Sequence, residues 1–182
     1  MTRGMLAAAA WAIRTVPLLL IAAAPAAERP CLTEPEASAL AAVALPDIIR
    51  QAGTTCAARL PAASLLRRQS SPMLQRYDAE ADRAWPAARA AIVKLSDPTA
   101  SALLQSDYAR PLLTSLVAPL IVGRIAPSDC GTIDRLVTLL EPLPPRNTAG
   151  VIVTALRYLR DARPPAGTTN PVATLPLCPG GR

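Results

Sequence analysis

The sequence predicts an all-α protein, a single bundle of about six to seven helices with several of them bent at proline. Hydrophobic residues make up 51% of the chain, yet aromatic residues make up only 3% and Phe is absent. The core must therefore consist of Leu, Val, Ile and Ala, and abundant Ala favours helices over strands. Apolar residues recur at helical spacing, and no run alternates convincingly enough for a strand. A chain of 182 residues suits one domain.

Residues 1–26 have the pattern of a cleaved secretory signal peptide. Arg3 and Arg14 precede an apolar stretch that ends in Ala24-Pro25-Ala26, the small-x-small pattern that signal peptidase accepts. The apolar stretch contains only about a dozen residues, fewer than the ~20 that a spanning helix needs. We therefore expect no transmembrane anchor after cleavage and a periplasmic or secreted location.

The charge of the chain favours anionic partners only weakly. The net charge is +6, and Lys94 is the one Lys among nineteen basic residues. This excess of Arg is typical of GC-rich bacterial genomes. Because the arginines are dispersed among acidic residues and few aromatic side chains can stack on bases, we expect no nucleic-acid partner. An envelope protein, or an anionic or apolar envelope component, is the expected partner.

Residues 27–162 are predicted to form the helical domain and residues 163–182 a Pro/Gly-rich tail, an extended strap tethered by its cysteine. The chain has no His and no C-x-x-C motif, which argues against a metal site. An even number of cysteines in an exported chain predicts two disulfides. The cysteines are Cys31, Cys56, Cys130 and Cys178.

Helix geometry suggests how these cysteines pair. If residues 33–44 and 47–59 form two helices joined by a tight turn at Leu45-Pro46, the helices run antiparallel. Cys31 then lies beside Cys56, and we expect these two to pair. Cys130 remains to pair with Cys178, which would attach the tail to the start of a late helix.

Several element boundaries can be predicted from capping residues and prolines. Thr33 and Glu36 form a capping-box pattern at the start of the first helix. A short helix is expected over 61–69. Residues 72–95 show a heptad-like apolar seam, and Pro86 should kink this helix without ending it. Further helices are expected over 97–106, after Ser128 and after Asn147.

Residues 111–125 form the most apolar run after the N-terminal segment, and we expect a helix at the centre of the bundle here. Leu112, Leu116 and Leu120 repeat every fourth residue, and a second apolar row follows beside them. Thr114 and Ala118 lie in a row of small residues that would allow another helix to approach closely. The run is too short to cross a bilayer, so we expect the leucine face to be covered by other helices.

The composition excludes most catalytic designs. Without His there is no Ser-His-Asp or Cys-His arrangement, and no Gly-rich phosphate-binding motif is present. We predict no catalytic residue, metal or cofactor. The candidate binding residues belong to a polar cluster in the helix over 72–95: Arg76, Tyr77, Trp85 and Arg89.

Three functions remain as hypotheses. The first is a non-catalytic binding or scaffolding role in the bacterial cell envelope. The second is a carrier of an apolar or lipid-like ligand, with a pocket lined by Leu112, Leu116 and Trp85. The third is a hydrolase that uses carboxylates from the cluster Asp78, Glu80 and Asp82, which requires two of them to face each other in a cleft.

Overall fold

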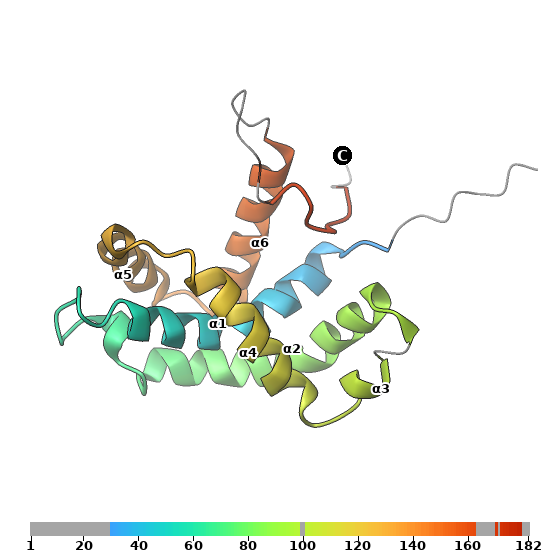
Figure 1. Cartoon of the computed structure of the whole chain (residues 1–182), viewed down its shortest axis with the longest axis horizontal. Helices are drawn as coiled ribbons and strands as arrows, with labels where there is room; N and C mark the ends of the chain where they lie inside the picture. Colours follow the sequence, from blue (N-terminus) through green and yellow to red (C-terminus); the bar gives the residue numbers. More distant parts are fainter. Residues whose placement is uncertain (1–29, 99–100, 163–169, 171, 180–182) are drawn as a thin grey trace, which may run out of the picture.

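The computed structural model describes residues 30–98, 101–162, 170 and 172–179. Within these residues the chain is helical, without a named strand, which confirms the predicted fold class (Figure 1). The α-helices are α1 (Glu34–Thr55), α2 (Pro72–Leu95), α3 (Ser101–Leu104), α4 (Ala109–Val122), α5 (Cys130–Leu140) and α6 (Pro145–Asp161). Two 3-10 turns join them, η1 (Leu65–Arg67) and η3 (Pro127–Asp129). The predicted signal peptide, residues 1–26, lies outside the described residues.

The core is centred on α1 and α2, which lie side by side and run antiparallel (Figure 1). Apolar side chains at helical spacing on each helix face the other helix and the η1 turn. The largest fully buried apolar side chains come from these elements: Val43, Leu66, Met73, Leu74 and Tyr77. The core therefore contains an aromatic ring in addition to the expected aliphatic residues.

The first two predicted helices are a single helix, α1, with Pro46 inside it. The apolar pattern continues in phase across the proline, since Leu45 and Ile49 are both buried, so packing against α2 offsets the hydrogen bond that Pro46 cannot donate. A straight helix of 22 residues is about 33 Å long. Cys31 and Cys56 consequently lie near opposite ends of α1 and cannot pair.

The predicted disulfide pairing is therefore wrong, although two disulfides are present. Cys31 pairs with Cys178, and Cys56 pairs with Cys130. Cys178 does tether the C-terminal segment, as expected, but to the segment that precedes α1.

The prediction for α2 is confirmed at both ends. Its N-terminus begins at Pro72, where Ser71 Oγ accepts a hydrogen bond from the backbone N–H of Leu74 at 3.3 Å. Pro86 lies inside the helix, and the axis of α2 changes direction along its length (Figure 1). The small residues of the predicted seam, such as Ala81 and Ala88, are fully buried.

The expectation that the run over 111–125 forms a covered central helix is wrong. Helix α4 lies across the outside of α1 (Figure 1). Its small face is buried through residues such as Thr114 and Ala118, while Leu116 and Leu120 are 61% and 71% exposed. The small side chains allow α4 to approach α1 closely, and this contact turns the leucine row outward.

Candidate functional site

An apolar groove of about 520 Å³ lies between α1, α4, α6 and the C-terminal strap. This volume is within the range of small-molecule binding sites. All fourteen lining residues are apolar: Leu32, Ala37, Leu40, Ala41, Ala44, Leu45, Ile48, Val117, Ile121, Ile152, Val153, Leu156, Leu175 and Leu177. The groove therefore offers dispersion contacts and burial from water, but no charged anchor on its walls.

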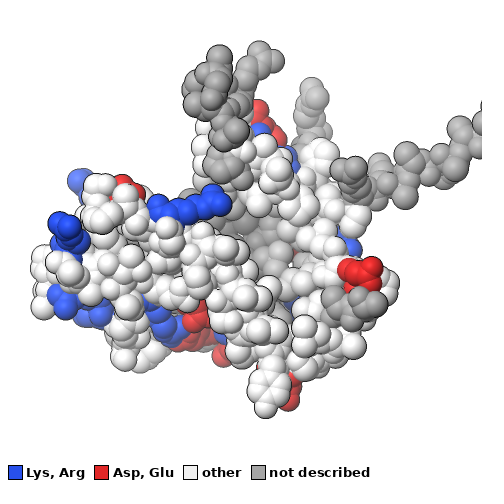
Figure 2. Space-filling view, viewed as in Figure 1, with Lys and Arg blue, Asp and Glu red and all other residues white. Residues whose placement is uncertain are grey.

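Each helix contributes the residues that helical spacing places on the face toward the groove. Helix α1 contributes residues from Ala37 to Ile48, and α4 contributes Val117 and Ile121, one turn apart. The wall from α6 contains Val153 and its neighbours on the same face. The surface is hollowed between α4 and α6, and the atoms around this hollow are mostly uncharged (Figure 2).

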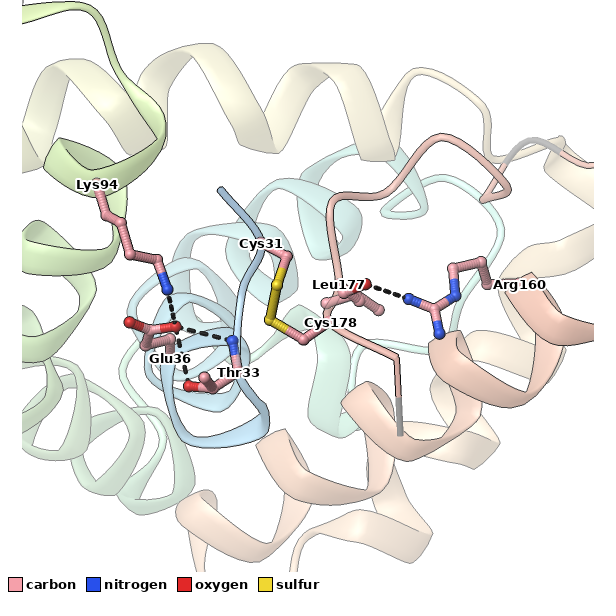
Figure 3. The surroundings of a disulfide bond; sticks show 7 residues. All are labelled: Cys31, Thr33, Glu36, Lys94, Arg160, Leu177 and Cys178. Atoms are coloured by element: carbon pink, nitrogen blue, oxygen red, sulfur yellow. Dashed lines mark hydrogen bonds and ion pairs between the residues drawn. A yellow bond between two sulfur atoms is a disulfide. The ribbon is translucent and has the colours of Figure 1, made fainter. Parts of the chain in front are cut away.

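The C-terminal strap closes one side of the groove and is held by several bonds (Figure 3). The Cys31–Cys178 disulfide attaches it to the segment before α1. The Leu32 N–H donates to the Pro176 carbonyl at 2.6 Å, and the Cys178 N–H donates to the Leu32 carbonyl at 2.8 Å. The strap is therefore a fixed wall that carries Leu177 into the groove.

Arg160 of α6 supports the same wall from the other side. Its Nη1 donates to the carbonyl oxygen of Leu177 at 2.5 Å (Figure 3). The guanidinium also contacts Asp161 at 2.8 Å, and this bond lowers the pKa of the Asp161 carboxyl. One arginine thus links the end of α6 to the backbone of the strap.

The N-terminus of α1, beside the strap, is fixed by the predicted capping box. The Glu36 carboxylate accepts hydrogen bonds from the Thr33 N–H at 2.7 Å and from the Thr33 hydroxyl at 2.9 Å. Lys94 of α2 donates to the same oxygen at 2.6 Å (Figure 3). The Lys94 bond, followed by the two Thr33 bonds, lowers the pKa of Glu36 from its ordinary 4.5 to about 2.

A second apolar cavity of about 270 Å³ shares lining residues with the groove. Leu45, Ile48 and Ile121 line both spaces. The inner cavity is otherwise lined by core residues of α1, α2, α5 and their neighbours. These three side chains therefore separate the groove from the inner cavity.

The predicted binding residues do not come together at one site. Tyr77 is 1% exposed, and its hydroxyl donates to Thr148 Oγ1 at 3.0 Å in the core. Burial raises the pKa of the Tyr77 phenol. Arg76 is exposed and donates to the backbone carbonyl of Glu141 at 2.7 Å. These two residues therefore join α2 to other elements. Neither lines the apolar groove, although Tyr77 is among the core residues around the inner cavity.

Trp85 and Arg89 do lie together, in a separate polar depression of about 630 Å³ between α1, α2 and the start of α4. Asp47 and Asp107 line the same depression, as does Arg110. The apolar pocket expected around Trp85 is therefore not formed there. Its other two expected residues, Leu112 and Leu116, project from the exposed side of α4.

The three carboxylates of the hydrolase hypothesis are each engaged by a different arginine. Asp78 pairs with Arg50 at 2.5 Å, Glu80 pairs with Arg83 at 2.7 Å, and Asp82 pairs with Arg110. The Asp78 bond also raises the pKa of Arg50. No metal-holding group of three or more acidic or cysteine side chains occurs within the described residues.

Sequence reasoning missed the groove residues on α4 and α6. The signal was present for α4, because Val117 and Ile121 form the second apolar row beside the leucines. From the sequence alone the two rows form one broad apolar face, which predicts that both are buried. In the structure, α4 packs against α1 through its row of small residues. One of the two apolar rows then lines the groove.

Comparison of the chain with protein-family models, curated proteins and solved structures finds no match. None of the helices in the described part is by itself long and apolar enough to cross a bilayer. Helix α4 together with residues Pro127–Leu140 meets that test only as a pair bent by 92°.

Proposed function

We propose that this protein is a non-catalytic binding protein that carries an apolar, lipid-like ligand in the groove between α1, α4 and α6. The observation that supports the proposal most directly is the lining: fourteen apolar residues around about 520 Å³, with no charged residue among them. An exported location in the bacterial envelope, suggested by the pattern of residues 1–26, is part of the same proposal. Acyl chains are abundant ligands of that compartment.

The energetics favour an acyl chain over a polar metabolite. Each buried methylene group contributes about 0.8 kcal/mol, so about ten of them correspond to roughly 8 kcal/mol before the cost of ordering the chain. That value lies in the micromolar range of dissociation constants. A polar ligand would lose its hydration without gaining a hydrogen-bond partner from the groove walls.

The full chain is expressed in cells, and the protein is purified in the form that the cells produce. Native mass spectrometry of this protein tests for a retained lipid. Titration with a fluorescent fatty acid then gives an affinity. The test variant is Leu156→Glu, which places a charge in the groove, and its matched control is Leu159→Glu on the same helix. Leu159 is 52% exposed and lies outside the groove lining.

We expect Leu156→Glu to weaken fatty-acid binding at least tenfold and Leu159→Glu to leave it unchanged. Because a charge at Leu156 could also disturb packing, a second pair keeps the site apolar. Val117→Trp fills the groove from α4 and should also weaken binding at least tenfold. Leu120→Trp lies on the exposed row and should leave binding unchanged. Equal binding by all four variants would refute the groove as the site.

A further inference from the structure

Helix α4 presents an unpartnered row of leucines to solvent. Leu112, Leu116 and Leu120 are 44%, 61% and 71% exposed, and they follow one another every fourth residue. No charged residue occurs between Arg110 and Arg124. Single apolar side chains scattered over a surface are common, but this row is contiguous along one helix. Contiguous exposed apolar patches mark binding surfaces.

The leucine row leads into the most basic part of the described surface, which we call the basic end and define as residues 56–71 and 123–140. The Cys56–Cys130 disulfide joins its two segments. Asp134 adds a second link, because its carboxylate accepts from the Ser64 hydroxyl at 2.5 Å and the Leu66 N–H at 3.3 Å. The two segments therefore form one surface.

Five arginines lie on the basic end against two aspartates, and both aspartates are occupied locally. Asp134 bonds to η1, and Asp129 accepts from the Ala126 N–H at 3.0 Å. Within the part of the chain that the structure describes, none of these arginines forms an ion pair: Arg59, Arg67, Arg68, Arg124 and Arg135. Basic side chains gather at the end of the molecule that carries residues 56–71, while the centre of the same face, over α4, is mostly uncharged (Figure 2).

We propose that α4 and the basic end dock this protein onto the surface of an anionic lipid bilayer. An apolar helix face combined with unpaired basic residues is the design of interfacial helices, which bury their apolar side in the acyl boundary and attract anionic headgroups. With 14 residues, α4 is about 21 Å long, which suits a position parallel to the surface.

A bilayer fits this surface better than a second copy of the chain does. None of the five arginines lies in α4, so a dimer contact made through α4 alone would leave the basic end unused. A lipid surface is extended, so it can meet the leucine row and the basic end together. Docking does not require an occupied groove. The membrane proposal can therefore be tested independently of the proposed carrier function. If both hold, Val117 and Ile121 place the groove beside the bound membrane.

Vesicle sedimentation tests the proposal, with vesicles of phosphatidylcholine alone and of phosphatidylcholine mixed with phosphatidylglycerol. We expect binding to the anionic vesicles that weakens with added salt. Leu116→Ser/Leu120→Ser should weaken this binding at least tenfold, because two side chains no longer leave water. The matched control is Val151→Ser/Leu159→Ser. It removes one valine and one leucine side chain of α6, each 52% exposed, and should retain binding.

A charge pair of variants tests the second half of the surface. Arg59→Gln/Arg68→Gln should weaken binding to anionic vesicles about fivefold for each arginine removed. Arg83→Gln/Arg146→Gln removes the same charge from α2 and α6 and should have a smaller effect. Equal vesicle binding by all these variants would overturn the proposal. So would a dimer in sedimentation velocity that only Leu116→Ser/Leu120→Ser dissociates, because the leucine row would then belong to a second copy.

Discussion

Leu32 and Leu177, which lie 145 positions apart in the sequence, form an isolated parallel β-bridge and both line the apolar groove. The adjacent Cys31–Cys178 disulfide holds this bridge together. The wall of the groove therefore depends on a covalent link between the two ends of the described chain.

Removal of this disulfide should open the groove. The Cys31→Ser/Cys178→Ser variant leaves the strap without a covalent link, although the backbone bonds of Leu32, the Arg160 bond and the Asn170 bonds to α6 remain. We expect hydrogen exchange at the backbone amide of position 178 to accelerate and fatty-acid binding to weaken. By the chain-entropy model, a bridge that spans 147 residues contributes about 5 kcal/mol to the free energy of unfolding, and urea unfolding measures this loss.

The control is Cys56→Ser/Cys130→Ser, which removes the bridge between the C-terminal end of α1 and the start of α5. Its loop spans 74 residues, so the expected loss of stability is similar, about 4.5 kcal/mol. Its ligand affinity should be unchanged under conditions where it remains folded, because neither cysteine lines the groove. Equal loss of affinity in both variants would show that global stability, and not the strap, controls binding.

The predicted and the observed disulfide pairings differ, and this difference shows what the sequence alone does not determine. The prediction of two disulfides needed only the cysteine count and the expected exported compartment. The pairing required knowing whether Pro46 ends a helix, and that depends on burial against α2 rather than on the proline itself. A continuous α1 separates Cys31 from Cys56 and brings each of them to a cysteine from the second half of the chain.

The same limit explains α4. Local spacing correctly predicted a helix with a leucine row and a small-residue row, and the small row does pack as expected. Periodicity cannot say which of two possible faces is covered, because that choice is made by tertiary contacts. In contrast, α2 was predicted to its end residues, because Ser71 and the heptad-like seam are signals within the segment.

Replacing Gly53 with Ala is predicted to destabilise the protein, although Gly53 lies inside α1 and Ala normally stabilises a helix. A Cβ atom there would lie 2.1 Å from the carbonyl oxygen of Leu66, a backbone atom of the η1 turn. Gly53→Ala should therefore lower the free energy of unfolding by about 1–3 kcal/mol, despite the better helix propensity of Ala. Gly150→Ala in α6 is the control, because a Cβ there meets nothing within 4 Å and should raise stability by up to about 1 kcal/mol.

The Tyr77 hydroxyl is predicted to contribute to stability and not to ligand binding. Tyr77→Phe removes its hydrogen bond and leaves the Thr148 hydroxyl, which is 1% exposed, without that donor. We expect a loss of about 1–3 kcal/mol in chemical unfolding with unchanged fatty-acid affinity. Tyr158→Phe, at a position that is 75% exposed, should change stability by less than about 0.5 kcal/mol. A selective loss of ligand binding in Tyr77→Phe would contradict this assignment.

Glu36 is predicted to make stability depend on pH in the acid range. Its pKa is about 2 in the folded chain and 4.5 ordinarily, chiefly because of the bond from Lys94. Between these values the unfolded chain binds more protons than the folded chain does, so stability decreases as the pH falls through this window. The contribution is fully present above about pH 4.5 and absent below about pH 2.

Urea unfolding of the wild type and of Glu36→Gln at several pH values measures this dependence. The variant should be less stable at neutral pH, and its stability should fall less steeply between about pH 4.5 and pH 2, the two pKa values of Glu36. Lys94→Met removes the largest cause of the shift but keeps both Thr33 bonds, so it should retain part of the dependence at a higher pH. Parallel acid curves for the wild type and Glu36→Gln would show that other carboxylates control acid unfolding.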